Sequence, residues 1–313
     1  MLTTEQVLKK ATIKLRTCKI KESSILVSGH KVRGILKDDS TQIVIKTPQL
    51  DAEVILCNLL GVDRIKLHIY PEKKISQEIC RKFWIDVERR ENGMPVQYIV
   101  NRQEFMGLDF FVEKGVLIPR PDTELLVEES LEICKKKLSE SCIEVFELGT
   151  GSGAISVSLA KFIDRVRIKA VDISEKAIEV AKKNAHTHEV DEKIEFMLGD
   201  MFAPILNKGK EKFFDIIISN PPYIPKRDIE ALIPQVKNYE PLLALDGGED
   251  GLDFYRKIIM RAPNFLKDKG WLALEIGYDQ GEKTSGLMNE RGFRNVVVKK
   301  DLAGFDRVVV GQW

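Results

Sequence analysis

The chain has 313 residues, of which 43% are hydrophobic and 31% are charged, and its formal net charge is +1. This length allows two domains, the composition is typical of a folded globular protein, and the nearly neutral charge argues against a stable nucleic-acid partner. No apolar run approaches the ~18 residues of a membrane span and the amino-terminal residues lack a signal-peptide pattern, so we expect a cytoplasmic protein with no membrane partner.

The cysteines and histidines do not predict a metal site. The five cysteines are widely spaced and contain no C-x-x-C pair, which argues against both a disulfide framework and a zinc site. His186 and His188 form an H-x-H pair, but no third ligand has a suggestive spacing. We therefore expect no metal ion.

Residues 1–92 are predicted to form a small helical domain. Apolar residues recur at helical spacing over residues 3–16 and again over residues 50–60, where Gly61 is expected to end the helix. A third helix is expected over residues 76–91. This region has the pattern of a helical bundle.

Two segments of different character interrupt or follow these helices. Residues 24–47 contain short β-like runs around glycines and are predicted to be an insertion in the helical domain. Residues 93–118 are predicted to be a β-hairpin linker, with extended runs over residues 97–100 and 108–112.

Residues 119–313 alternate between strand and helix patterns, and Asp122 or Thr123 is expected to cap the first helix. Such alternation predicts a mainly parallel sheet with helices on both faces. The short loop around Gly304 requires the last two strands to be antiparallel, because parallel neighbours need a longer crossover. The predicted strands cover residues 143–148, 166–172, 193–198, 213–219, 270–276, 295–298 and 307–310. The expected fold is a seven-stranded, doubly wound α/β sheet with an antiparallel C-terminal hairpin.

A glycine-rich turn follows the first strand of this sheet. The strand over residues 144–148 runs into Gly149-Thr150-Gly151-Ser152-Gly153 and then into a helix. Such a turn lets the backbone approach a ligand closely and leaves N–H groups free at the helix N-terminus. The sequence also matches the dinucleotide pattern G-x-G-x-x-G/A, so nicotinamide and other nucleoside ligands are both possible. Asp172, at the end of the next strand, can accept hydrogen bonds from both hydroxyls of a ribose.

The tetrapeptide Asn220-Pro221-Pro222-Tyr223 follows the apolar strand over residues 214–219. The two prolines remove two backbone donors, so the carbonyl groups here act as acceptors. The Asn220 oxygen adds an acceptor and Tyr223 an aromatic face, a combination that suits the planar NH2 of an amide or of a base. We expect Asn220 Oδ1 and the Pro221 carbonyl to accept the two NH2 hydrogens, with Tyr223 stacked on the amide plane.

Three further features separate the nucleoside alternatives: Glu147 before the glycines, Asp200-Met201 after the third strand, and the NPPY tetrapeptide after the fourth. A nicotinamide enzyme has no evident use for NPPY. An S-adenosylmethionine enzyme needs carboxylates for the ribose and the cationic amino-acid portion, together with a holder for the nucleophile. All these residues follow adjacent strands, where open α/β sheets bind ligands. The combination favours S-adenosylmethionine.

The motifs FELGTGSGAIS, AVDIS, GDMF, ISNPPYIP, EPLLALDGGEDGLDFYRKII and LEIG, after QYIVNRQEFMGLDFFVEKGVLIPRPDTELLVE, resemble the PrmC/HemK protein-(glutamine-N5) methyltransferases. The resemblance covers residues 93–313, and PQLDAEVILCNLLG is similar to the family's helical substrate-recognition domain. It implies a class I, Rossmann-like fold. It also implies methyl transfer from S-adenosylmethionine, with S-adenosylhomocysteine as product, to the glutamine of the Gly-Gly-Gln motif of peptide chain release factors 1 and 2, which modulates translation termination.

The predicted site follows from these motifs. Catalysis is assigned to Asn220, Pro221 and Tyr223, and substrate binding to the same residues and Pro222. Met201 lies where relatives often have an aromatic residue against adenine. The predicted cofactor-binding residues are Glu147, Gly149, Thr150, Gly151, Ser152, Gly153, Asp172, Asp200, Met201 and Asn220.

Three other functions are compatible with the same motifs. Glutamine methylation of a ribosomal protein uses the same chemistry. Adenine-N6 methylation of nucleic acid requires a flipped or single-stranded base and a basic groove, whereas the amino-terminal third has only short basic clusters such as Lys73-Lys74 and Arg89-Arg90. A module that only binds the cofactor is the third. The segment over residues 24–47 is longer than the family's usual helix connection, and the sequence does not indicate its role.

Overall fold

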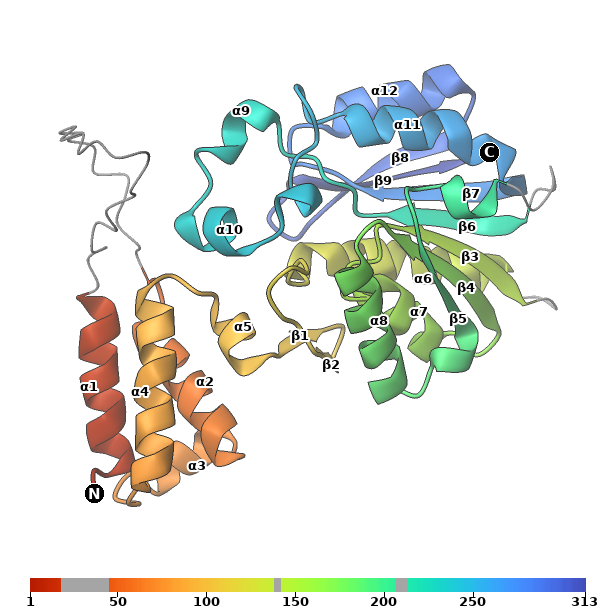
Figure 1. Ribbon diagram of the computed structural model, residues 1–313. Helices are drawn as coiled ribbons and strands as arrows, with labels where there is room; N and C mark the ends of the chain where they lie inside the picture. Colours follow the sequence, from red (N-terminus) through yellow and green to blue (C-terminus); the bar gives the residue numbers. More distant parts are fainter. Residues whose placement is uncertain (18–44, 138–141, 207–212) are drawn as a thin grey trace. The chain divides into compact units, whose positions relative to one another are not determined.

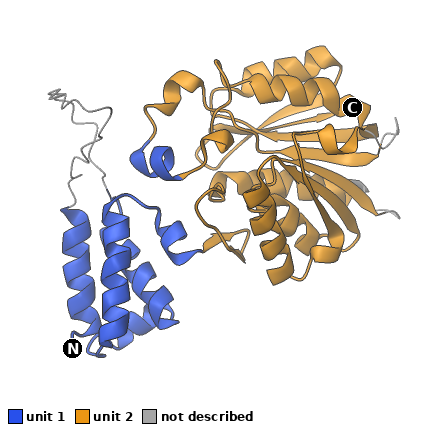
Figure 2. Cartoon of the chain, viewed as in Figure 1, with its two compact units in different colours: residues 1–101, 233–239 blue, residues 102–232, 240–313 orange. Residues whose placement is uncertain are grey.

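The computed structural model describes residues 1–17, 45–137, 142–206 and 213–313 (Figure 1). The predicted β-like insertion over residues 24–47 lies outside the described residues, apart from residues 45–47. The chain divides into two compact units, one of residues 1–101 with 233–239 and the other of residues 102–232 with 240–313 (Figure 2).

The first unit is helical. Thr3 begins α1 with a capping box, because its side chain accepts from the Gln6 backbone and Gln6 bonds back to Thr3. Gly61 ends α2 in the left-handed conformation, as predicted. The buried ion pair between Arg90 of α4 and Asp51 of α2, 2.6 Å long, joins two helices whose apolar faces form one core. The helices are α1 (Thr4–Arg16), α2 (Pro48–Leu60), α3 (Arg64–Ile69), α4 (Gln77–Glu91), α5 (Val96–Val100) and α10 (Pro234–Tyr239).

One predicted element of the linker is wrong. Residues 97–100 were expected to be extended, but they belong to the helix α5. Their β-branched side chains favour a strand only weakly, and here Tyr98 and Ile99 are buried, so packing overrides the propensity. The hairpin itself is present a few residues later, as β1 (Gln103–Phe105) paired with β2 (Leu108–Phe110).

The second unit contains a seven-stranded sheet in the order β5-β4-β3-β6-β7-β9-β8. The pairs from β5 to β7 are parallel, and β9 is antiparallel to both β7 and β8. This confirms the predicted fold with its antiparallel C-terminal hairpin. The strands are β3 (Ile143–Leu148), β4 (Val166–Asp172), β5 (Ile194–Leu198), β6 (Phe214–Ser219), β7 (Leu266–Glu275), β8 (Arg294–Lys300) and β9 (Asp306–Gln312).

Helices cover both faces of this sheet (Figure 1). Alternate strand residues point to opposite faces, so Val145 packs in a core with α6 and α7, whereas Phe146 packs in a second core with α11 and α12. The helices are η2 (Pro121–Thr123), α6 (Glu124–Lys137), α7 (Ala154–Phe162), α8 (Glu175–Thr187), η3 (Asp191–Lys193), η4 (Ala203–Ile205), α9 (Lys226–Ile229), η5 (Leu242–Ala244), α11 (Asp253–Arg261), η6 (Ala262–Asn264) and α12 (Gly281–Arg291).

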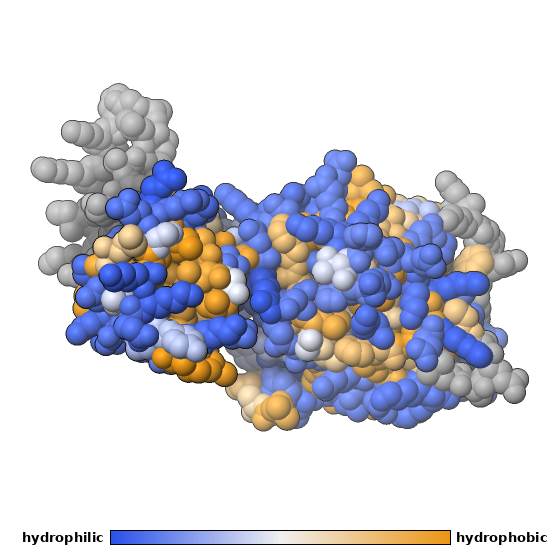
Figure 3. Space-filling view, turned by 90° about the horizontal axis from the view of Figure 1, so that it is seen from below, coloured by the Kyte–Doolittle hydropathy of each residue, from blue (hydrophilic) through white to orange (hydrophobic). Residues whose placement is uncertain are grey.

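The surface is mainly hydrophilic, with smaller hydrophobic areas between the polar residues on the face shown in Figure 3. Exposed apolar side chains include Ile65, Ile69 and Tyr70 in and after α3. Across the described ranges, no helix has both the length and the apolar character that crossing a membrane would require.

Candidate active site

The strand order reverses at the centre of the sheet, and this point locates the candidate site. The chain proceeds from β3 to β4 and β5 on one side, and later to β6 and β7 on the other. Open α/β sheets bind ligands in the crevice at such a reversal, beyond the carboxyl ends of the strands. Leu148 of β3 is paired in register with Ser219 of β6. The glycine turn and NPPY therefore begin side by side.

The glycine turn has a close contact with α8 at Gly153 and open space beside Gly149 and Gly151. Gly153 has a φ of +80°, and a Cβ at this position would lie 3.1 Å from the Cβ of Ala181 in α8, so any larger residue would be strained here. A Cβ placed on Gly149 or Gly151, by contrast, would have no heavy atom of the described residues within 4 Å, apart from the glycine and its two chain neighbours. The Gly151 N–H donates to Asp172 Oδ2 at 2.8 Å. The turn thus offers bare backbone to an adjacent ligand.

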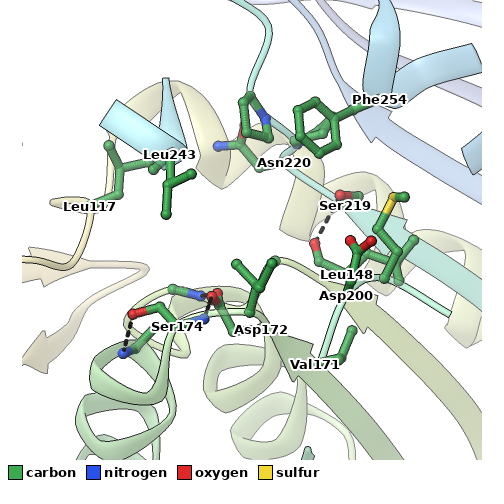
Figure 4. A pocket seen from close by; sticks show the side chains of 18 of the residues that line it. Leu117, Leu148, Val171, Asp172, Ser174, Asp200, Ser219, Asn220, Leu243 and Phe254 are labelled. Carbon is green, nitrogen blue, oxygen red and sulfur yellow. Dashed lines mark hydrogen bonds between the residues drawn. The ribbon is translucent and has the colours of Figure 1, made fainter. Parts of the chain in front are cut away.

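A cavity of about 300 Å³ lies in front of this turn (Figure 4). Asn220 and Phe254 lie on one side of it, and Asp172 and Ser174 lie on the opposite side. The structure brings together around this cavity the sequence-predicted residues Gly149, Gly151, Asp172, Asp200, Met201, Asn220, Pro221 and Pro222.

The other predicted site residues lie beside the cavity rather than in its lining. Thr150 and Ser152 are buried within the turn, and the Ser152 carbonyl accepts a hydrogen bond from Asn184. Glu147 is buried beneath the turn. Tyr223 lies beyond the prolines, where its carbonyl accepts from Gln280 Nε2 at 2.9 Å. Gly153, the fifth of these residues, is held against α8 as described above.

Glu147 is a fully buried carboxyl group. Its Oε2 accepts from the Thr150 hydroxyl at 2.8 Å, and its Oε1 has no hydrogen-bond partner in the described part of the chain. Burial raises the pKa of Glu147 from 4.5 to about 7, although hydrogen bonds with Thr150 and Ser156 lower it. Glu147 therefore supports the turn through Thr150, and within the described ranges its Oε1 has no hydrogen-bond donor.

Two carboxylates line the cavity in different environments. Asp172 is fixed by backbone N–H groups of Gly151 and Ser174, and burial nevertheless raises its pKa. Asp200 is exposed at the end of β5, and Met201 after it has a φ of +45°, a conformation that side chains rarely adopt. A rigid carboxylate thus lies beside the glycine turn and a solvated one lies farther along the sheet edge.

Asn220 is held from behind by two polar side chains. Its Nδ2 donates to Thr123 Oγ1 at 3.1 Å, and its side chain lies near the buried carboxyl group of Glu275, whose pKa it lowers. Nearby, burial raises the pKa of Tyr223 to about 12, with a further increase from Glu275. The Tyr223 phenol is therefore neutral near neutral pH.

Several cavity-lining residues are not among those predicted from sequence. Val116 and Leu117 come from the segment after the hairpin, Leu243 comes from η5, and Phe254 and Lys257 come from α11. All five lie within motifs that carry the family resemblance, but they are apolar or common residue types to which no local pattern assigns a ligand. Only their meeting at one cavity distinguishes them from core or surface residues.

The chain matches known protein families over most of its length. A family model described as the PrmC N-terminal domain matches residues 39–100, and one described as the methyltransferase small domain matches residues 123–238. The release factor glutamine methyltransferase of Clostridium acetobutylicum is 40% identical over 296 residues, which cover 93% of this chain and 98% of the relative. That of Geobacter sulfurreducens is 42% identical over 271 residues, or 86% and 90% of the two chains.

A solved structure supports the fold. The hMettl16 catalytic domain, in complex with the MAT2A 3′UTR hairpin 6, has a TM-score of 0.52 and 14% identity. The match covers 75% of this chain and 82% of that chain. At this identity the likeness concerns the fold alone.

Proposed function

We propose that this chain, which belongs to the release factor glutamine methyltransferase family, transfers a methyl group from S-adenosylmethionine to the side-chain nitrogen N5 of a glutamine. The substrate is the glutamine of the Gly-Gly-Gln motif in release factors 1 and 2. The observation that carries the proposal is the juxtaposition of NPPY and the glycine turn at one cavity.

The residues around the cavity fit S-adenosylmethionine. The open space beside Gly149 and Gly151 would admit the cofactor against bare backbone, and Asp172 offers its carboxylate to the ribose hydroxyls. The apolar side chain of Met201 would pack on the adenine. When bound, the cofactor supplies an electrophilic methyl group on a cationic sulfur. The carboxylates of Asp172 and Asp200 give the cavity the charge that suits such a cation.

NPPY would hold and orient the substrate amide. Asn220 Oδ1 and the Pro221 carbonyl accept the two NH2 hydrogens, while Pro222 has no N–H to compete for the same acceptors. An amide nitrogen is a poor nucleophile because its lone pair is delocalised, so restraining the NH2 in a reactive orientation is the main task of these residues. Tyr223 would contribute its ring and does not act as a general base, because its phenol is protonated near neutral pH.

The remaining parts of the chain receive roles in the same scheme. Residues 1–92 would recognise the release factor, and residues 119–313 would catalyse the transfer. Residues 93–118 would link these two domains. Since release factors act in translation termination, the proposed function implies a cytoplasmic location. Ribosomal-protein and adenine methylation are not favoured, because the curated relatives are named for release factors.

The proposal is tested by transfer of labelled methyl from S-adenosylmethionine. Purified release factor, ribosomal proteins and total RNA are offered in parallel, and a release factor with Gln→Ala in its Gly-Gly-Gln motif is the control. Label on wild-type release factor alone is expected. Label on RNA or ribosomal protein with none on release factor would reject the proposed substrate.

A variant tests the assigned chemistry. Asn220→Ala is expected to lower turnover by roughly 10²–10³-fold, the usual effect of removing one preorganised hydrogen-bonding group. The matched control is Asn289→Ala, an exposed asparagine of α12. Turnover of the Asn220 variant within about threefold of wild type, with cofactor binding intact, would contradict the role of Asn220.

A further inference from the structure

Glu275 lies next to Asn220 because of the strand register. Ser219 at the end of β6 is paired with Leu274 of β7, so the next residues, Asn220 and Glu275, are also neighbours across the sheet edge. The two residues are far apart in the sequence, and Thr123 reaches the same place from η2. Three separate segments thus meet behind NPPY.

The carboxyl group of Glu275 is costly to keep at this place. Glu275 is 1% exposed, and its Oε2 has no hydrogen-bond partner among the described residues. Buried carboxyl groups that lack full hydrogen bonding lower the stability of a fold unless they are compensated. The chemistry of Glu275 therefore points to a use other than stability.

The neighbours of Glu275 determine which way the Asn220 amide points. The Thr123 hydroxyl and the Asn220 side chain both lie close enough to the carboxyl group to lower its pKa, and Asn220 Nδ2 donates to Thr123 Oγ1 at 3.1 Å. An ionised carboxylate only accepts hydrogen bonds, so Thr123 gives it the hydroxyl proton and can only accept from Asn220. The Glu275 carboxylate and the Thr123 oxygen are both acceptors, so each requires a donor, which only the Nδ2 end of the amide provides. The hydrogen bond from Nδ2 to Thr123 agrees with this orientation. Oδ1 is then the end directed to the cavity.

We propose that Glu275, together with Thr123, is a positioning residue that directs Asn220 Oδ1 toward the substrate NH2. This inference rests on the proposed function, in which that oxygen accepts a hydrogen from the glutamine amide. A flipped Asn220 would present its own NH2 to the substrate NH2, where two donors face one another. The role of Glu275 is therefore to exclude the unproductive rotamer of Asn220.

The protonation state of Glu275 gives this arrangement a pH dependence. Burial raises the pKa of Glu275 from 4.5 to about 7, while Thr123, Arg307 and Asn220 lower it. A protonated Glu275 is able to donate to Thr123, which then can donate to Asn220 Oδ1 and favour the flipped amide. Among the residues that the structure describes, the charged and titratable groups that interact with this carboxyl group are Arg307, Asp122, Tyr223 and Tyr255.

The decisive experiment compares single and double variants in methyl transfer to release factor. Glu275→Gln is expected to lower kcat by about 10- to 100-fold, while the Kd for S-adenosylmethionine, measured by calorimetry, stays within about threefold. In an Asn220→Ala background the same change should have no further effect on kcat, because Glu275 acts through Asn220. Glu144→Gln, on the strand β3, is the matched control and should leave kcat unchanged.

Variants of Thr123 provide a second test that keeps the carboxyl group. Thr123→Ser retains the hydroxyl and should keep kcat within about threefold of wild type. Thr123→Val keeps the shape without the hydroxyl and should lose activity as Glu275→Gln does. If Glu275→Gln fails to fold, the comparison of Thr123→Ser with Thr123→Val still tests the positioning role.

The outcomes separate the two proposals. If the wild-type chain methylates release factor and both Glu275→Gln and Thr123→Val keep its full activity, the positioning role alone is overturned. The positioning role would also be overturned if Glu275→Gln and Asn220→Ala multiply their effects, because independent losses indicate a structural role. A wild-type chain that transfers no methyl to release factor would overturn the proposed function, and the positioning role with it.

Discussion

The buried carboxyl group of Glu147 makes a quantitative prediction about stability and pH. In the unfolded chain its pKa is the ordinary 4.5, whereas in the folded chain it is about 7. The folded state therefore keeps a proton that the unfolded state loses, so stability is greatest below the unfolded pKa and falls as the pH rises toward about 7. The variant Glu147→Gln removes this loss.

The magnitude follows from the two pKa values. Their difference corresponds to about 3 kcal/mol of lost stability, fully present near pH 8, of which only about 1 kcal/mol is present near pH 5. Relative to wild type, Glu147→Gln should therefore be more stable near pH 8 than near pH 5 by about 2 kcal/mol. Its altered hydrogen bonding with Thr150 is independent of pH and cancels in this comparison.

Urea unfolding without cofactor measures the effect. A Trp84→Phe background leaves Trp271 and Trp313, both in the second unit, so tryptophan fluorescence reports that unit alone. Glu144→Gln is the control, because the Glu144 side chain on the same strand is 28% exposed. If Glu147→Gln and wild type show the same pH dependence, burial does not raise the pKa of Glu147 and the reasoning is wrong.

Three further changes test the glycine turn, the cofactor site and the helical unit. Asp172→Asn should raise the Kd for S-adenosylmethionine by roughly 10- to 100-fold, since charged hydrogen bonds are lost; an unchanged Kd in calorimetry would remove Asp172 from the site. Gly153→Ala should lower the free energy of unfolding by about 1–3 kcal/mol, because its φ is +80° and the new Cβ would lie 3.1 Å from that of Ala181; a urea midpoint equal to wild type would show that the turn relaxes freely. Asp51→Ala leaves the buried Arg90 unpaired and should cost about 3–5 kcal/mol; retention of wild-type unfolding, followed by circular dichroism, would mean that water replaces the lost partner.

Much of the second unit could be predicted from the sequence because its signals are local. Alternating apolar strands and helices predicted the parallel sheet, and the short loop at Gly304 predicted the antiparallel hairpin, both of which the structure confirms. The motifs also indicated the family that the comparisons confirm. The roles assigned to NPPY and to the glycine turn stay predictions, although the structure brings several of these residues to one cavity.

Where long-range packing competes with local propensity, the local pattern was insufficient. The run over residues 97–100 has strand-forming side chains, yet it is a helix because Tyr98 and Ile99 are buried there. Similarly, Thr123 is a candidate helix cap by its sequence position, whereas in the structure its side chain is bonded to Asn220. A side chain with several suitable partners is assigned only when its neighbours in space are known.

The sequence by itself determined the seven strands of the sheet, the glycine turn and NPPY, because backbone preferences and apolar periodicity act over a few residues. Only the tertiary structure decided that Glu275 lies behind Asn220 and that Leu243 and Phe254 line the cavity. These neighbours come from strand register and from segments far apart in the chain. A pairing between β6 and β7 leaves no mark on either strand alone, so its consequences for the site appear only in the folded molecule.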